Sequence, residues 1–109
     1  MKLVQCVFVR SDLVWNAGAL VAQACHATSA VNHARRVYSP TQEASVKIIQ
    51  VPGEAALQSV GTLLEQQGIH HKMWIEQPEN IITCACTEMQ PEADWQRLEE
   101  LLKASLPTH

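Results

Sequence analysis

Gln23 and His26 are the two side chains of this sequence with the clearest potential for chemistry. They stand three residues apart in a segment whose pattern predicts a helix, so both lie on one helical face. A histidine with its ordinary pKa of about 6.5 can act as a general base near neutral pH. The glutamine amide could orient the imidazole or a water molecule. The structural alternative is that both are polar residues of a packed helix, satisfied by backbone groups.

Two carboxylates follow predicted strands. Asp12 comes directly after the first strand, where an aspartate commonly holds a loop by accepting backbone N–H bonds. Glu76 ends the third predicted strand and is a candidate acid or base. The alternative for Glu76 is a solvated strand-end carboxylate. In the turn that follows, Gln77 and Asn80 could bind a substrate, although turn chemistry also explains Asn80.

The cysteines indicate a protein with reduced thiols. All four lie in apolar segments: Cys6, Cys25, Cys84 and Cys86. We therefore expect core residues of a cytosolic protein. Cys84 and Cys86 share one strand face and, with His70 or His71 of the preceding strand, could bind zinc. An apolar C-x-C strand is more typical of a core, so no metal site is predicted and no cofactor is expected.

Strands and helices that could position these residues follow from hydrophobic periodicity and turn residues. Strands are expected over residues 2–10, 45–51, 70–76 and 81–87, and helices over residues 17–37, 54–67 and 91–105. Asn16 suits the N-cap of the first helix and Gly68 the position after the second. The order βαβαββα predicts one α/β domain over residues 1–109, with helices on both faces of a largely parallel sheet. The short link at residues 77–80 requires the last two strands to run antiparallel if they pair.

The first predicted helix carries no Asp, Glu, Lys or Arg over residues 17–34. Surface helices normally carry charge on their wet side, so we expect this helix to be covered on more than one face. A second helix, a partner in a homodimer or a functional cleft could each provide the cover. Its polar residues argue against a membrane span, and no membrane association is expected.

The net charge of −3 argues against broad, sequence-independent binding of nucleic acid, which usually rests on an excess of basic residues. A local basic patch remains compatible with this charge. Its candidates are Arg35, Arg36, Lys47 and Lys72.

Three segments carry a resemblance to a known family. Residues 10–13 read R-S-D-L, residues 18–27 read G-A-L-V-A-Q-A-C-H-A, and residues 74–81 read W-I-E-Q-P-E-N-I. The sequence resembles the type II (archaeal and eukaryotic) peptidyl-tRNA hydrolases over nearly its whole length, in particular the divergent branch of peptidyl-tRNA hydrolase domain-containing proteins. The resemblance implies a three-layer α/β/α sandwich on a mixed four-stranded sheet. It also implies hydrolysis of the ester that joins a peptide, or an N-blocked aminoacyl group, to the terminal ribose of tRNA.

The same resemblance gives roles to the candidate residues. The catalytic candidates are His26, Gln23, Glu76 and Thr83, and the binding candidates are Asp12, Gly18, Gln77 and Asn80. The sequence also departs from the family pattern. Active members carry a lysine beside the helix-opening glycine, where this chain has Ala17 and Ala19. The acidic loop before the last strand is shorter here, and Ile81 replaces one of two threonines.

Two functions are compatible with these observations. The first is a hydrolase that works with a modified set of groups around Gln23, His26 and residues 76–83. The second is a catalytically degenerate family member that binds tRNA acceptor ends or a protein partner. The retained glycine, glutamine and histidine favour the first. The missing lysine, the shorter acidic loop and the negative net charge favour the second. A homodimer formed through the charge-free helix is compatible with both.

Overall fold

The computed structural model describes residues 2–34 and 44–105. In chain order the elements are β1 (Leu3–Arg10), α1 (Ala17–Ala34), β2 (Ala44–Val51), α2 (Glu54–Gln66), β3 (His71–Glu76), β4 (Ile81–Thr87), β5 (Gln90–Pro91) and α3 (Glu92–Ser105). The predicted elements are therefore confirmed to within a residue wherever both ends are described. The predicted end of the first helix at residue 37 lies outside the described residues. The two-residue strand β5 was not predicted.

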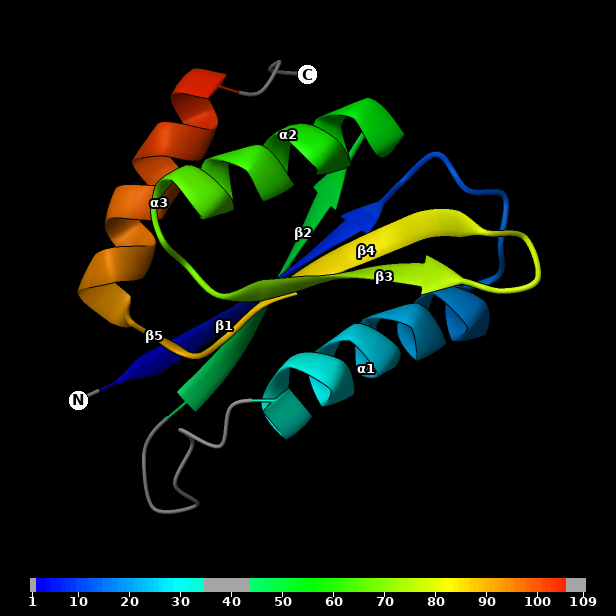
Figure 1. The fold of residues 1–109 in the computed structure, drawn as a ribbon, viewed down its shortest axis with the longest axis horizontal. Coiled ribbons are helices and arrows are strands. Elements are labelled where there is room, and N and C mark those ends of the chain that lie inside the picture. Colours follow the sequence, from blue (N-terminus) through cyan, green and yellow to red (C-terminus); the bar gives the residue numbers. More distant parts are fainter. Residues whose placement is uncertain (1, 35–43, 106–109) are drawn as a thin grey trace.

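The strands form a single mixed sheet in the order β2-β1-β4-β3, with β5 paired to the start of β1 (Figure 1). Strands β1 and β2 are parallel, whereas β4 is antiparallel to both β1 and β3. The prediction of a largely parallel sheet is thus wrong, although the mixed sheet and the antiparallel last pair are confirmed. Both helical crossovers keep the strand direction as expected. The sheet is nevertheless mostly antiparallel because β4 returns between β1 and β3.

Helices cover the two faces of the sheet unequally. Helices α2 and α3 pack on one face, and α1 lies alone on the other (Figure 1). Helix α1 contacts β4, β3 and β1. This arrangement confirms the three-layer α/β/α sandwich. On the side of α1, Val46 and Ile48 of β2 remain 53% and 58% exposed.

Each face has its own apolar cluster. The side of α2 and α3 is built on buried residues that include Val4, Phe8, Val51, Leu57, Leu64, Ala85, Trp95 and Leu98. The side of α1 has a smaller cluster of Val7, Val9, Ala27, Val31, Cys84 and Cys86. The alternation of these residues along β1 reflects the two-residue period of a strand.

The ends of two helices follow the predicted capping. The Asn16 side chain accepts the amide N–H of Ala19 at 2.8 Å, which makes it the N-cap of α1. Helix α2 ends at Gln66, and Gly68 follows the C-cap Gln67 with a φ of 70°, in the left-handed region that glycine tolerates best. The amides of Gly68 and of the next residue donate to the carbonyls of Glu65 and Leu64. This pair of hydrogen bonds ends α2 and directs the chain into β3.

The four cysteines are free, and three of them are buried. Burial raises the pKa of Cys6 to about 12, and that of Cys84 and of Cys86 to about 11. The prediction of a core residue is wrong for Cys25, which is exposed. Its position on α1 turns away from the sheet, because the residues of α1 that face the sheet are Gln23, Ala27 and Val31.

Candidate functional site

A chain of hydrogen bonds joins α1, β3 and β4. The Thr83 hydroxyl donates to the Gln23 side-chain carbonyl at 2.9 Å. The Gln23 amide nitrogen then donates to the Glu76 carboxylate at 3.0 Å. The indole N–H of Trp74 donates to the other oxygen of Glu76 at 3.3 Å. Three of the four catalytic candidates are therefore connected side chain to side chain.

An irregularity between β3 and β4 makes this connection possible. Trp74 pairs with Cys84, but the next residue, Ile75, pairs with Ile82, so Thr83 is an extra residue in the ladder. Successive strand side chains normally point to opposite faces, yet Thr83 and Cys84 both contact Gln23. The bulge turns Thr83 toward α1, whereas regular alternation would direct it toward α2. The alternation of residues along β4 did not indicate this direction of Thr83.

Gln23 is 3% exposed, and its side-chain partners are other side chains. The structural alternative expected backbone partners for Gln23, and this part of it is wrong, whereas the expected packing of the side chain is observed. Because the Thr83 hydroxyl occupies the carbonyl end, the NH₂ end of the amide faces Glu76. Gln23 thus holds a carboxylate and a hydroxyl at fixed positions on either side of it.

Glu76 is a half-buried carboxylate with a stabilised charge. The hydrogen bond from Gln23 is the main cause that lowers its pKa, against a partial opposing effect of burial. The bond from Trp74 and the charge of His26 act in the same direction. Glu76 is consequently ionised at neutral pH.

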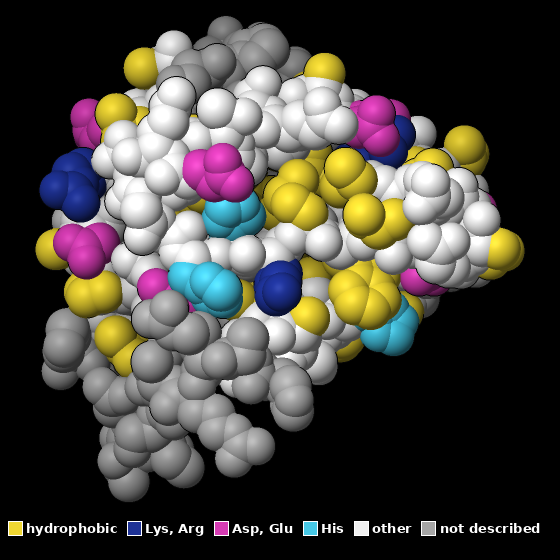
Figure 2. Space-filling view, in the orientation of Figure 1, with side chains coloured by type: hydrophobic (Ala, Val, Ile, Leu, Met, Phe, Trp, Pro, Cys, Tyr) yellow, Lys and Arg dark blue, Asp and Glu magenta, His cyan; other side chains and the backbone are white. Residues whose placement is uncertain are grey.

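His26 is exposed and stacks on Trp74, with ring centroids 5.0 Å apart and planes inclined by 23°. The pair forms one wall of a cavity of about 820 Å³ between α1 and β3. We call this the β3 cavity, and its lining residues are His26, Ser29, Ala30, Lys72, Met73, Trp74 and Ile75. In Figure 2, histidine, basic and hydrophobic side chains lie next to one another on the face of the molecule that carries β3. The fourth catalytic candidate thus joins the site through Trp74.

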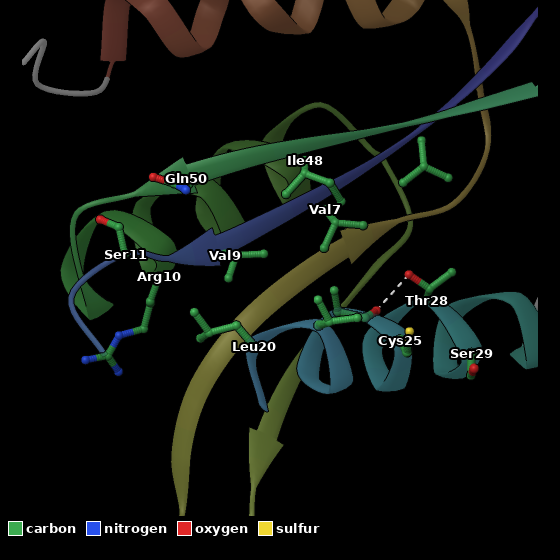
Figure 3. Close-up of a pocket in the computed structure, with 13 residues that line it drawn as sticks. Val7, Val9, Arg10, Ser11, Leu20, Cys25, Thr28, Ser29, Ile48 and Gln50 are labelled. Carbon is green, nitrogen blue, oxygen red and sulfur yellow. Dashed lines mark hydrogen bonds between the residues drawn. The ribbon is translucent and has the colours of Figure 1, made fainter. Parts of the chain in front are cut away.

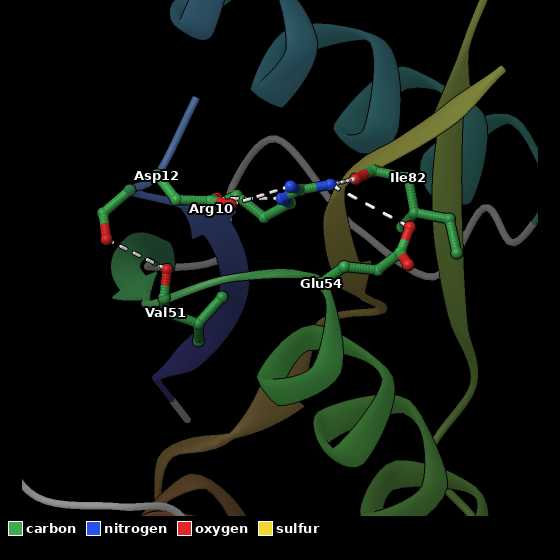
Figure 4. A network of polar contacts seen from close by, with 6 residues as sticks. Arg10, Asp12, Val51, Glu54 and Ile82 are labelled. Carbon is green, nitrogen blue, oxygen red and sulfur yellow. Dashed lines mark hydrogen bonds and ion pairs between the residues drawn. The ribbon is translucent and has the colours of Figure 1, made fainter. Parts of the chain in front are cut away.

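Asp12 belongs to a neighbouring polar network (Figure 4). Its carboxylate receives two bonds from the Arg10 guanidinium, at 2.9 and 2.8 Å. Arg10 also donates to the carbonyl of Ile82, the residue before Thr83, at 3.0 Å. The bond from Arg10 is the largest cause that lowers the pKa of Asp12. Asp12 was expected to accept backbone N–H bonds, and a backbone bond is a minor cause of its lowered pKa. Its main partner is the guanidinium of Arg10, which ties β1 to β4.

The side chains of the other binding candidates lie apart from this chain of hydrogen bonds, although the backbone N–H groups of Gln77 and Asn80 bond Glu76. Gly18 is exposed in the first turn of α1, where an added Cβ would approach the Asn16 side chain to 3.4 Å. Gln77 donates to Asn80 at 3.1 Å within the exposed turn between β3 and β4. Asn80 has a φ of 58° and donates its amide N–H to the Glu76 carbonyl. The geometry of the turn explains the presence of an asparagine at position 80, which is the alternative given for Asn80 in the sequence analysis.

The opposite flank of α1 has a different chemistry. A groove of about 580 Å³ runs between α1 and strands β1 and β2. We call it the β2 groove, and its apolar lining residues are Val7, Val9, Leu20, Val21, Ala24, Val46 and Ile48. Figure 3 shows Leu20, Cys25 and Thr28 on the helix side and Val7 and Ile48 on the sheet side. Arg10, Ser11 and Gln50 add polar atoms to the lining.

No metal centre is evident in the part of the chain that the structure describes, because it contains no group of three His, Cys, Asp or Glu side chains able to hold an ion. The zinc alternative at Cys84 and Cys86 is not supported, since both thiols are buried and Cys84 donates to the Gln23 carbonyl. Within residues 2–34 and 44–105, no helix is long and apolar enough to cross a membrane.

Sequence reasoning gave Arg10 and Trp74 no role in this region, and it named Lys72 only as a candidate for a basic patch. Trp74 and Lys72 were signalled by their spacing, because both stand an even number of residues from Glu76 on one strand. Arg10 was signalled only by its spacing of two from Asp12. Of the basic candidates, Arg35 and Arg36 lie outside the described residues.

Comparison with known proteins identifies the class. Residues 3–104 match the family model of peptidyl-tRNA hydrolase PTH2, so the chain belongs to this family and is a peptidyl-tRNA hydrolase-like protein. A human protein named "Putative peptidyl-tRNA hydrolase PTRHD1" is 39% identical over 104 residues, which cover 84% of this chain and 74% of that protein. The mouse protein of the same name is 36% identical over 105 residues, with the same two coverages.

Proposed function

We propose that this protein hydrolyses the ester between a peptide, or an N-blocked aminoacyl group, and tRNA. The observation that carries the proposal is the hydrogen-bonded chain from Thr83 through Gln23 to Glu76, with His26 stacked on the tryptophan that also donates to Glu76. Family membership supports the reaction class. The assignment of the residues rests on their geometry and charge.

In the proposed reaction His26 is the general base. Its imidazole takes a proton from water while the water oxygen attacks the ester carbonyl carbon. The carbonyl oxygen becomes an oxyanion, and the tetrahedral intermediate then collapses with cleavage of the bond to the ribose oxygen. The imidazolium returns its proton to that oxygen. The products are the free peptide acid and tRNA.

Glu76 and Gln23 support the histidine without reacting. The ionised carboxylate of Glu76 stabilises the imidazolium, an interaction that is mutual because the charge of His26 lowers the pKa of Glu76. Gln23 is a positioning residue that fixes the carboxylate, and Thr83 fixes the orientation of the Gln23 amide. Ala17 and Ala19 supply no cation for the oxyanion. We therefore expect slower turnover than in a lysine-bearing relative.

The alternative is a binding module that has lost the reaction. It is favoured by the alanines that stand where active members carry lysine, by the shorter acidic loop and by the net charge of −3. Under this alternative the protein binds tRNA or a protein partner, and Gln23 and Glu76 serve only to hold β3 and β4 against α1.

A single assay separates the two functions. Purified full-length protein is given labelled N-blocked aminoacyl-tRNA, alongside the variants His26→Ala, Glu76→Gln and His71→Ala. His71 is a matched control, because its ring bonds the Ile69 carbonyl rather than a side chain of the site. We expect turnover in the wild type, a loss of roughly 100-fold or more in the first variant, and little change in the control. Absence of turnover by folded wild-type protein would favour the binding module, and turnover that survives both site variants would refute the assignment.

We infer further that a second copy of the chain covers the β2 groove. Val21 is 61% exposed beside the groove, on a helix without charge that could itself enter a groove of the same kind. The exposed side of α1 and the β2 groove therefore lie on one surface, which is what a two-fold symmetric interface requires. Exposed Val46 and Ile48 would gain an apolar cover in such a homodimer.

We also propose that the protein works in the cytosol. This is supported by four cysteines that are all unpaired, a pattern typical of reducing compartments. Imaging of the tagged full-length chain tests the location, and exclusive localisation to an oxidising compartment would contradict it.

A further inference from the structure

We propose that the β3 cavity is the seat of the terminal nucleoside of the single-stranded tRNA end. The nucleobase stacks on the free face of His26, and the phosphate on its 5′ side pairs with Lys72. The inference rests on the proposed function, because it names the part of the substrate that the site holds while the ester reacts.

The stacked rings are suited to a nucleobase. Bases stack on aromatic side chains regardless of sequence, since every base has a π-face. Trp74 is held in place by its N–H bond to Glu76, and it supports His26 from one side. His26 is exposed, so its other face is open to a third ring. The ring nitrogens of His26 lie in the plane of the imidazole, and stacking leaves them able to exchange a proton.

Lys72 supplies a charge at the appropriate place. It lines the same cavity, stands two residues before Trp74 on β3, and is exposed. Among the residues that the structure describes, no carboxylate lies within ion-pair distance of its ammonium group. It is also the one lysine or arginine among the residues that line the cavity. We therefore expect a single phosphate contact rather than a long electrostatic track.

The position of the seat matches the proposed chemistry. Trp74 contacts His26 through its ring face and Glu76 through its N–H group, so it joins the seat to the carboxylate. The ester of peptidyl-tRNA lies on the ribose of the same nucleoside. A base stacked on His26 therefore brings the scissile carbonyl to the side of Glu76. By contrast, the β2 groove is lined by aliphatic side chains and offers no ring on which a base could stack.

The net charge of −3 bears on which interactions can provide affinity for RNA at this seat. A protein with an overall negative charge gains little from general attraction to RNA. Affinity must then come mainly from stacking, which contributes roughly five- to 150-fold per base. The affinity of the seat should therefore depend on the terminal nucleoside of the RNA strand and not on the length of the strand.

Binding is tested with a short, fluorescently labelled single-stranded RNA that has the 3′ sequence of tRNA, by anisotropy with the full chain. We expect Trp74→Leu to weaken binding roughly ten-fold or more, and Trp74→Phe to retain most of it because a ring is kept. Lys72→Gln, on an exposed side chain, should weaken binding a few-fold and lower the salt slope by about 0.7. Thermal unfolding of each variant verifies that it is folded.

An RNA that lacks only the last base is the matched ligand control. It should bind wild-type protein about as weakly as the complete RNA binds Trp74→Leu, and the variant should not discriminate between the two RNAs. Equal binding of both RNAs by the wild type would overturn the seat. So would unchanged affinity in Trp74→Leu together with an unchanged salt slope in Lys72→Gln.

The outcome is distinguishable from that of the hydrolase proposal. RNA binding with this dependence but without turnover would keep the seat and refute hydrolysis. Turnover by wild-type protein with a KM that is unchanged in Lys72→Gln and in Trp74→Phe, and no discrimination of the missing base, would keep hydrolysis and refute the seat.

Discussion

The two flanks of α1 differ in what the same charge-free helix does. On the side of β3 and β4, Gln23 and His26 engage Glu76, Thr83 and Trp74 in polar and stacking contacts. On the side of β1 and β2, the helix offers aliphatic residues to a groove that is left open. The helix residues on both flanks include no Asp, Glu, Lys or Arg. The reason for this absence of charge differs between the two flanks.

The difference follows from the position of the helix over the sheet. Helix α1 packs on β4, β3 and β1. A buried amide can therefore meet the carboxylate at the end of β3, while β2 keeps its apolar row uncovered. A charge-free helix is thus weak evidence for burial on all sides. On the flank of β3 and β4, the neutral amide of Gln23 holds the Glu76 carboxylate, so the helix needs no charged residue there. On the flank of β1 and β2, the helix residues line an apolar groove that suits an apolar partner.

The largest effect should come from Gln23→Leu, compared with the matched variant Gln5→Leu. Gln5 is also a buried glutamine, bonded to Asn32 and to the carbonyl of Thr87, but it is not part of the site. Each variant leaves buried partners unsatisfied and should lose about 1–3 kcal/mol of unfolding free energy. We expect turnover to fall roughly 100-fold in Gln23→Leu alone.

Denaturant unfolding and ester hydrolysis are measured on both glutamine variants. Equal loss of activity in the two would mean that turnover follows stability, and the distinction between the flanks would fail. Retained activity in Gln23→Leu would remove Gln23 from the site altogether.

The apolar flank is tested by Ile48→Lys. A lysine in the β2 groove places a charge where the proposed homodimer excludes water, so we expect the variant to be monomeric at concentrations where the wild type is dimeric. Hydrolysis should change little, since Ile48 does not contact the polar flank. Sedimentation equilibrium gives the mass of both proteins. A wild type that stays monomeric at the highest soluble concentration would contradict the dimer.

Thiol labelling sharpens the same contrast by a smaller, local effect. Cys25 is exposed on α1 and lines the β2 groove, whereas burial holds the pKa of Cys6 at about 12 and that of Cys84 at about 11. Reaction needs an accessible thiolate, so the monomeric Ile48→Lys variant should react rapidly at one thiol in its native state and at four when denatured. A dimer that covers the β2 groove should protect Cys25. Cys25→Ser should remove the rapid phase. More than one rapid thiol in the native state would show that the sheet opens readily.

The smallest effect is expected for the pH dependence of stability at Glu76. Its pKa in the folded state is lowered from the ordinary value of 4.5, so its stabilising contribution is complete above that value and is lost as the pH falls through the folded pKa. The difference in Tm between wild type and Glu76→Gln should be constant near neutral pH and shrink below pH 4.5. The pKa of Asp12 is also lowered, but Asp12 is present in both proteins, so its contribution to the difference in Tm cancels. A difference that grows on acidification would contradict the role of Glu76.

Much of the fold could be predicted from local pattern. Periodicity, the N-cap at Asn16 and the glycine after α2 act within a few residues, so the sequence indicates them directly. The place of β4 between β1 and β3 depends on contacts between distant segments, and the periodicity did not contain it. The exposure of Cys25 was missed for a similar reason, because it depends on how α1 is rotated over the sheet.

The candidate site divides in the same way. Gln23 and His26 were found because their spacing on a helix is local, and Thr83 was named only through the family resemblance. Nothing in the alternation of β4 indicated that Thr83 faces α1, because a bulge changes direction through the pairing of two strands. The Arg10–Asp12 pair had only its spacing of two as a signal, and the bond between the two side chains became evident with the loop geometry.

The extra residue in β4 means that a related chain could keep the fold and still lose the contact between Thr83 and Gln23. A descendant chain that lost one residue at Thr83 could pair β3 and β4 regularly and keep its core, yet no hydroxyl would reach Gln23. Such a chain would look like a faithful relative in composition and fold. The length of this strand, as much as any residue identity, is therefore what a search for active relatives should inspect.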